Sequence, residues 1–155
     1  MFGFKFKDYD KLSDGEVELI LKEKRRAVRN MALVPSYEFN INLADKNDIV
    51  GRISLRVGNT NRIKKYVGHI GYGVNEKYRG NHYAAKACDL VKQVAIDHGF
   101  KTLWITVNPD NYPSRRTCDI LGCEMVEIVN IPEYLDMYRQ GERQKCRYRW
   151  DIKNT

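Results

Sequence analysis

The sequence is poor in the residues that metal centres and disulfide frameworks need. It has four cysteines and three histidines among 155 residues. The cysteines form no Cys-x-x-Cys pair, and a disulfide is not expected in a chain without an export signal. We therefore expect no metal cofactor and assign the thiols to structural or site-lining positions. The four cysteines are Cys88, Cys118, Cys123 and Cys146.

Long apolar runs are also missing. No stretch approaches the roughly 18–20 consecutive apolar residues of a membrane span. Residues 1–6 lack a continuous apolar segment and a small-residue cleavage site, which argues against a signal peptide. We expect a cytoplasmic protein with no membrane partner.

Glycine and proline are scarce, with 11 and 4 residues respectively. Together with 43% hydrophobic and 30% charged residues, this scarcity excludes intrinsic disorder, collagen-like repeats and low-complexity linkers. A chain of this length buries enough surface for a core that needs no disulfide or metal. We expect residues 1–155 to form a single domain.

Positive charge is concentrated in the middle of the chain. The net charge is +7, and residues 51–100 contribute +6 of it, with nine basic and three acidic residues. This concentration predicts a local anionic partner, either a phosphate-bearing cofactor or nucleic acid. A solvated basic surface is the alternative.

Hydrophobic periodicity predicts an α/β chain with a mixed sheet and helices on its faces. The run Ser13-Asp14-Gly15-Glu16 has the pattern of a capping box, which predicts a helix that ends near Pro35. A polar turn at residues 45–48 predicts a hairpin. Two later helices are expected to end at Gly99 and Gly122. The expected strands are 1–6, 37–43, 49–57, 66–75, 102–107, 123–130 and 144–152.

The strand–turn–helix junction at residues 70–98 carries the clearest chemical signal. A glycine-bearing strand leads into the turn Arg79-Gly80 and then into a helix of small residues. Free amides at a helix N-terminus, the helix dipole and a nearby arginine suit a pyrophosphate. An ordinary helix start with a tight turn is the alternative. The chain has no GxxxxGK[ST] loop, and Gly71-Tyr72-Gly73 lacks the third glycine of a dinucleotide fingerprint.

Two motifs make the sequence similar to the GNAT N-acetyltransferase superfamily. Ile70-Gly71-Tyr72-Gly73-Val74, followed by Tyr78-Arg79-Gly80-Asn81-His82-Tyr83-Ala84, resembles its acetyl-CoA motif, Arg/Gln-x-x-Gly-x-Gly/Ala. Residues 108–114, Asn-Pro-Asp-Asn-Tyr-Pro-Ser, leading to Leu121-Gly122, resemble its Asn-x-x-Ser…Leu-Gly-Phe helix. The order of elements agrees with that superfamily from Phe4 to Ile152.

The resemblance implies an acetyl-CoA site at these two motifs. Backbone groups around Val74 would bind the pantetheine arm, and the amides after Arg79 would bind the pyrophosphate. His82 stands where the motif usually has glycine, so a positive φ at this position would alter the local geometry. The implied cofactor-binding residues are Tyr72, Gly73, Val74, Arg79, Gly80, Asn81, His82, Tyr83, Ala84, Asn108, Asn111 and Ser114.

Acyl transfer to an amine needs a neutral amine, and an acid assists the departing thiolate. His69 stands where a glutamate often serves as base in the superfamily, and its ordinary pKa near 6.5 suits that role. A half-buried histidine bonded to a neighbouring strand is the alternative. Cys118 aligns with the tyrosine that often protonates the thiolate, and its thiol either donates a proton or packs in the core. The candidate catalytic residues are therefore His69 and Cys118.

The resemblance implies an acetyl-CoA-dependent N-acetyltransferase in which a primary amine attacks directly in a ternary complex. A non-catalytic acyl-CoA sensor or a basic RNA-associated module on the same fold is the alternative. Nucleic acid is disfavoured because the basic residues are not interleaved with stacking aromatics. The expected partners are a small-molecule or peptide amine, and a homodimer is also considered. The acceptor depends on loops, here the first helix region, 58–65 and 131–143.

Overall fold

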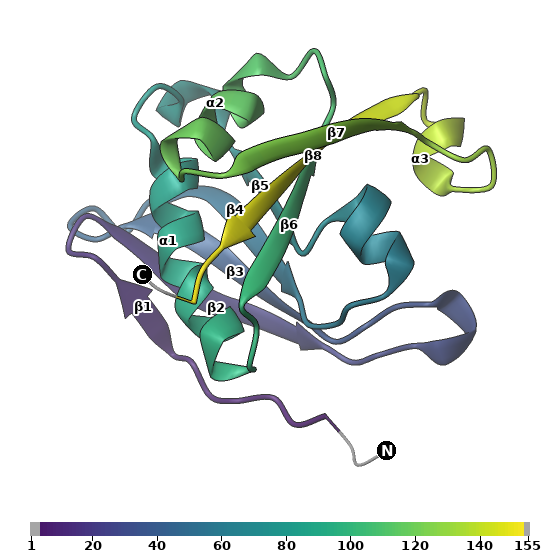
Figure 1. The fold of residues 1–155 in the computed structure, drawn as a ribbon. Helices are drawn as coiled ribbons and strands as arrows, with labels where there is room; N and C mark the ends of the chain where they lie inside the picture. The colour runs from purple at the N-terminus through teal and green to yellow at the C-terminus, as the bar shows by residue number, and fades with distance from the viewer. Residues whose placement is uncertain (1–3, 154–155) are drawn as a thin grey trace.

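The N-terminal part of the chain forms an antiparallel sheet in the order β1-β2-β3-β4-β5 (Figure 1). The computed structural model describes residues 4–153. Each strand pairs with the next one in sequence, and the expected hairpin between β3 and β4 is confirmed. The strands are β1 (Lys11–Ser13), β2 (Val17–Arg25), β3 (Ser36–Leu43), β4 (Ile49–Arg56) and β5 (Ile70–Val74).

Strand β2 replaces the helix expected from the capping box, so that prediction is wrong. Asp14 Oδ1 accepts hydrogen bonds from the backbone nitrogens of Glu16 (2.9 Å) and Val17 (2.8 Å). With Gly15 at φ +93°, these bonds close a turn between β1 and β2 instead of capping a helix. From Val17 to Ile20, buried and half-buried residues alternate, and Val17 and Leu19 have no exposed surface. Alternation of this kind is the period of a strand.

The strand expected over residues 1–6 is absent from residues 4–6, the part of this segment that the structure describes. Residues 1–3 lie outside the described part of the chain, and Phe4–Phe6 are not in a strand. Phe4 stacks on His98 with ring centroids 5.0 Å apart, and Phe6 meets Tyr37 edge-on at 5.2 Å. These rings therefore extend the core instead of the sheet.

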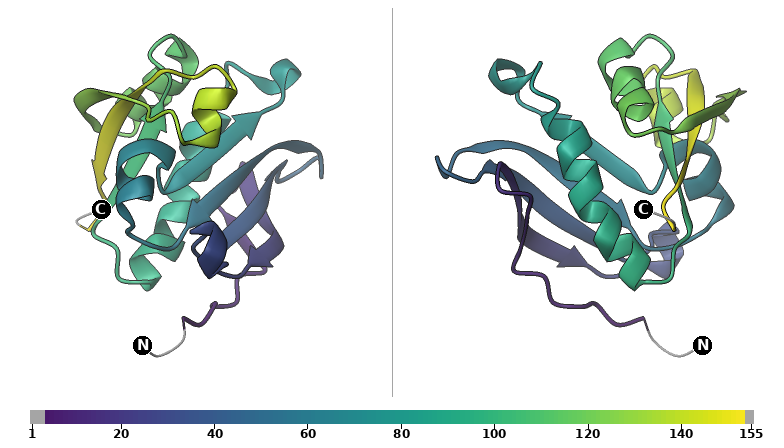
Figure 2. Two further views of the ribbon diagram at one scale, coloured as in Figure 1. Left: turned by 90° about the vertical axis from the view of Figure 1, so that its right-hand side faces the viewer. Right: turned by 60° about the vertical axis from the view of Figure 1, so that its left-hand side comes forward.

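Helix α1 (Tyr83–Asp97) covers one face of the five-stranded sheet, where it packs against β2, β4 and β5 (Figure 2). It ends before Gly99, whose φ of +87° stops the helix as expected. Small side chains on its buried face let the helix lie close to the strands. The buried residues of α1 are Ala85, Ala87, Cys88, Val91, Val94 and Ala95.

The C-terminal part forms a second antiparallel sheet, in the order β6-β8-β7. The strands are β6 (Thr102–Val107), β7 (Glu124–Asn130) and β8 (Gln144–Asp151), and the helices between them are α2 (Tyr112–Ile120) and α3 (Asp136–Arg139). These strands and α2 confirm the sequence-based expectations. The single sheet that was expected is instead divided into two.

The two sheets meet where β5 begins. Residues Ile63–Val67 form a π-helical turn, and Gly68 follows with φ +81°, so β5 is shorter than the expected strand. A Cβ at Gly68 would lie 3.2 Å from Thr106 N and Trp104 O, so glycine permits this close approach of β6. The backbone nitrogen of His69 then donates to Trp104 O (2.8 Å). This bond connects the residue that precedes β5 in the first sheet to β6 in the second sheet.

The expected α/β architecture, with helices flanking a sheet, is confirmed apart from the first helix and the division of the sheet into two. Between β2 and β3 there is only a connection of residues 26–35, which contains the short 3-10 turn η1 (Arg29–Met31). None of the helices within residues 4–153 is long and apolar enough to cross a membrane.

Candidate functional site

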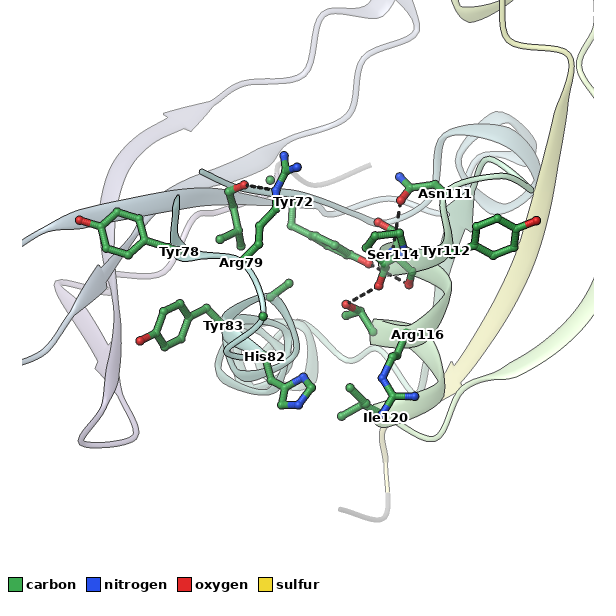
Figure 3. Close-up of a pocket in the computed structure, with 16 residues that line it drawn as sticks. Tyr72, Tyr78, Arg79, His82, Tyr83, Asn111, Tyr112, Ser114, Arg116 and Ile120 are labelled. Carbon is green, nitrogen blue, oxygen red and sulfur yellow. Dashed lines mark hydrogen bonds between the residues drawn. The ribbon is translucent and has the colours of Figure 1, made fainter. Parts of the chain in front are cut away.

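A groove of about 730 Å³ opens between the N-terminal ends of α1 and α2, beside β5 (Figure 3). We call it the α1–α2 groove. All of the expected cofactor-binding residues line it except Asn81 and Asn108. The lining residues are Tyr72, Gly73, Val74, Tyr78, Arg79, Gly80, His82, Tyr83, Ala84, Asn111, Tyr112, Pro113, Ser114, Arg116, Thr117 and Ile120.

The N-terminus of α1 presents backbone amides to this groove. A helix does not use the amides of its first turn, and no side chain within residues 4–153 caps this helix. Gly80 has φ +91°, and His82, the residue before the helix, has φ +61°. The left-handed conformation is unfavourable for a residue with a Cβ by about 1–2 kcal/mol. His82 thus adopts the backbone conformation that favours glycine, the residue usual at this motif position.

Two arginines line the groove, Arg79 from the turn before α1 and Arg116 from α2. Arg79 Nε donates to Val74 O (3.0 Å), which lays its side chain against the end of β5. Arg116 projects from α2 on the other side (Figure 3). Positive charge on both sides of free amides suits a phosphate-bearing ligand. Sequence reasoning missed Arg116, although its helical spacing from Tyr112 places both on one face of α2.

The second motif shapes the opposite wall. Asn111 Oδ1 accepts from the backbone nitrogen of Ser114 (3.3 Å) and so caps α2. Asn81 instead donates through Nδ2 to Tyr78 O (3.0 Å) and lies outside the groove. Asn108 lies outside it as well, and its Oδ1 is buried without a hydrogen-bond partner in the described residues.

His69 does not have the geometry of a base, so that expectation is corrected. It is fully buried and does not line the groove. Its Nδ1 accepts from the backbone nitrogen of Trp104 (2.9 Å), which leaves Nε2 to donate to Asn59 Oδ1 (2.9 Å). Burial lowers the pKa of His69 to about 4. The lone pair of Nδ1 is therefore already used in a hydrogen bond within the fold. This agrees with the alternative expectation, a histidine bonded to a neighbouring strand.

Cys118 is also a core residue and not a group of the groove. It has no exposed surface and belongs to the hydrophobic core beside Cys88. A hydrogen bond with Cys123 and burial both raise the pKa of the Cys118 thiol. The packing alternative therefore agrees with the structure, and the proton-donor role does not.

The described residues contain no cluster of three or more His, Cys, Asp or Glu side chains that could hold a metal ion. The chemistry of the groove is that of amides, guanidinium groups, hydroxyls and phenols. Groups of these kinds bind phosphates and polar chains through hydrogen bonds.

The acetyltransferase (GNAT) family model matches residues 8–122, so the chain belongs to this family. No curated protein matches in a sequence search. The matched segment contains the α1–α2 groove and both motifs that line it.

Solved structures share this fold at low sequence identity. Ribosomal-protein-S5-alanine acetyltransferase from Vibrio fischeri is 13% identical, with a TM-score of 0.67 over 93% of this chain and 97% of its own. The microcin C7 self-immunity acetyltransferase MccE, in complex with acetyl-CoA and AMP, is 21% identical, with a TM-score of 0.59 over 76% of this chain. The present chain spans 61% of that MccE chain. RimL in complex with coenzyme A is 16% identical, with a TM-score of 0.60 over 77% of this chain and 64% of its own.

Proposed function

We propose that this chain transfers an acetyl group from acetyl-CoA to a primary amine, which attacks directly within a ternary complex. The α1–α2 groove carries this proposal. It combines uncapped helix amides, two arginines and the end of β5 along one continuous surface. Solved structures of the same fold in complex with acetyl-CoA or coenzyme A support the choice of donor.

The residues of the groove fit the parts of this donor. The amides at Tyr83 and Ala84, together with Arg79 and Arg116, would hold the phosphates through charge-assisted hydrogen bonds. The backbone at β5 would align the extended pantetheine arm. When bound, acetyl-CoA supplies an activated acetyl thioester.

Positioning of the amine against the thioester would then account for much of the rate. His69 and Cys118 are both buried away from the groove, so His69 would not take the proton of the amine and Cys118 would not give one to the thiolate. Solvent is the acceptor for that proton. The same observation favours a second candidate function, a non-catalytic acyl-CoA sensor on this fold.

Ligand-induced stabilisation tests the donor site. At 100 times its Kd, acetyl-CoA should stabilise the protein by about 2.7 kcal/mol, or roughly 5–11 °C in Tm. Dephosphorylated pantetheine should give far less. Equal stabilisation by heparin or RNA would contradict a specific donor site.

Arg79→Ala should weaken acetyl-CoA binding by about 1.5–3 kcal/mol, because it removes one charge-assisted contact. Arg79 is exposed, so the variant should still fold.

Turnover separates the enzyme from the sensor. We would measure coenzyme A release from acetyl-CoA with polyamines, amino acids, aminoglycosides and peptide N-termini. N-terminal peptides of ribosomal proteins belong in this panel because two proteins of this fold, the S5-alanine enzyme and RimL, are named as ribosomal-protein acetyltransferases. Tight acetyl-CoA binding with no release above the uncatalysed rate for any amine would favour the sensor.

A further inference from the structure

Tyr72 is the tyrosine whose phenol reaches the floor of the α1–α2 groove. It lies on β5, is half-buried, and points toward the first turn of α2 (Figure 3). Its hydroxyl donates to Ser114 O across 3.4 Å. A bond of this length is weak, so the hydroxyl can exchange this partner for a ligand atom at little cost.

A hydrogen-bond donor at the sulfur assists acyl transfer from a thioester to an amine. Negative charge develops there as the carbon–sulfur bond breaks, and a preorganised donor stabilises that charge. Cys118 and His69 are both outside the groove. The Thr117 hydroxyl is already engaged, since it donates to Pro113 O (3.1 Å). The donors left at the floor are the hydroxyls of Tyr72 and Ser114, of which the phenol is the more acidic and the stronger donor.

Resting on the proposed function, we propose that Tyr72 is a catalytic residue whose hydroxyl turns from Ser114 O to the thioester sulfur. Over one turnover a carbon–nitrogen bond replaces the carbon–sulfur bond, and the bonding electron pair passes to sulfur. The surplus proton of the amine leaves through solvent, and one proton ends on sulfur, so the phenol is unchanged. Burial raises the pKa of Tyr72, which keeps this donor protonated at neutral pH.

Tyr72→Phe tests the assignment, and Tyr148→Phe is the matched control. Tyr148 is a buried tyrosine whose hydroxyl, like that of Tyr72, contacts α2, where it accepts from Arg115 Nε (3.1 Å), but it lies outside the groove. Both variants keep the ring and lose one hydroxyl. Tyr72→Phe should lower kcat by about 100-fold, the usual effect of removing one preorganised donor. Tyr148→Phe should keep kcat within about threefold of wild type.

A binding measurement gives a readout that does not depend on turnover. At pH 9 much of the free thiol of coenzyme A is ionised, whereas desulfo-coenzyme A has no sulfur. Calorimetry should show that wild type and Tyr148→Phe prefer coenzyme A over desulfo-coenzyme A. Tyr72→Phe should lose at least about tenfold of that preference, the effect of one hydrogen bond to a charged group.

The two proposals fail in different ways. No turnover by wild type with any amine would refute the proposed function, while the coenzyme A preference would still test the contact of Tyr72 with sulfur. An active wild type with kcat and ligand preference unchanged in Tyr72→Phe would overturn this inference. A loss of both in Ser114→Ala, with Tyr72→Phe unaffected, would overturn it too and assign the donor to Ser114.

Discussion

The side chain of His69 connects the first sheet to the second, at the point where β5 begins. Its ring bonds to the amide of Trp104 on β6 and to Asn59 in the preceding loop. Burial is the largest cause of its lowered pKa, and the nearby charges of Arg56 and Lys64 lower it further. A neutral imidazole is therefore part of the folded structure.

This histidine should make the fold sensitive to acid. The pKa of His69 falls from 6.5 to about 4 on folding. Between pH 6.5 and 4 the imidazole therefore binds a proton in the unfolded chain and stays neutral in the folded chain. Stability is full above pH 6.5 and is lost as pH falls to 4, by about 3 kcal/mol for this group. His69→Gln has no such group, so its unfolding free energy should fall less steeply over this window.

Urea unfolding of both proteins at pH 7, 6, 5 and 4 measures this difference. Burial also lowers the pKa of His98, but its contribution is present in both proteins and cancels in the comparison. Parallel pH curves would contradict the assignment. The same variant should keep kcat within about threefold of wild type, because His69 does not reach the groove.

The sequence could indicate His69 as a candidate but not its environment. Strand alternation predicts that His69, Gly71 and Gly73 share one face, which two glycines leave open. What alternation does not show is that β6 lies against the beginning of β5 and presents the amide of Trp104 to the ring. A single bond from a distant segment thus changed the expected role of the residue. Most groove residues, in contrast, lie within two continuous motifs whose local geometry the sequence already specifies.

At the scale of elements, the contact between β4 and β5 places the groove. Gly51 on β4 lies opposite Val74, the last residue of β5. A Cβ at Gly51 would fall well inside van der Waals contact with the carbonyl oxygen of Gly73. Gly73 itself has nothing within 4 Å of an added Cβ. An added methyl group would therefore clash at Gly51 and not at Gly73, although the two glycines are neighbours in the sheet.

Gly51→Ala should lower the unfolding free energy by about 1–3 kcal/mol, because the added methyl group forces the two strands apart. It should also weaken acetyl-CoA binding, since it displaces the end of β5 that lines the groove. Gly73→Ala is the stability control and should change the unfolding free energy by less than about 0.5 kcal/mol. Equal destabilisation by the two variants in urea unfolding would show that the close approach at Gly51 is unimportant.

The first helix was mispredicted because residues 17–28 fit two periods. Val17, Ile20, Leu21 and Val28 have helical spacing, whereas Val17, Leu19 and Leu21 have strand spacing. Pairing of β2 with both β1 and β3 decides in favour of the strand. Helices α1 and α2 were predictable because each has a clear beginning and a glycine after its end. The periodicity of one segment does not show which strands, distant in the sequence, will pair with it.

At the scale of the whole molecule, the groove lies between two halves of the fold. Helix α1 packs on the five-stranded sheet, while α2 follows β6 of the second sheet and contacts it. The Tyr72–Ser114 hydrogen bond crosses the groove from one half to the other. A ligand held by Arg79 on one side and Arg116 on the other would connect the two halves.

Hydrogen exchange should detect this connection as simultaneous protection of distant segments. A ligand that binds both walls opposes every opening that separates them, so at 100 times its Kd acetyl-CoA should slow such exchange by about 100-fold. The amides of Tyr83–Asp97 and of Tyr112–Ile120 should both be protected. Arg116→Ala should reduce the protection of the second segment more than that of the first, since it removes a contact on α2 alone. Protection confined to α1 would mean that the ligand is held by the Arg79 turn and that the opposite wall contributes no binding energy.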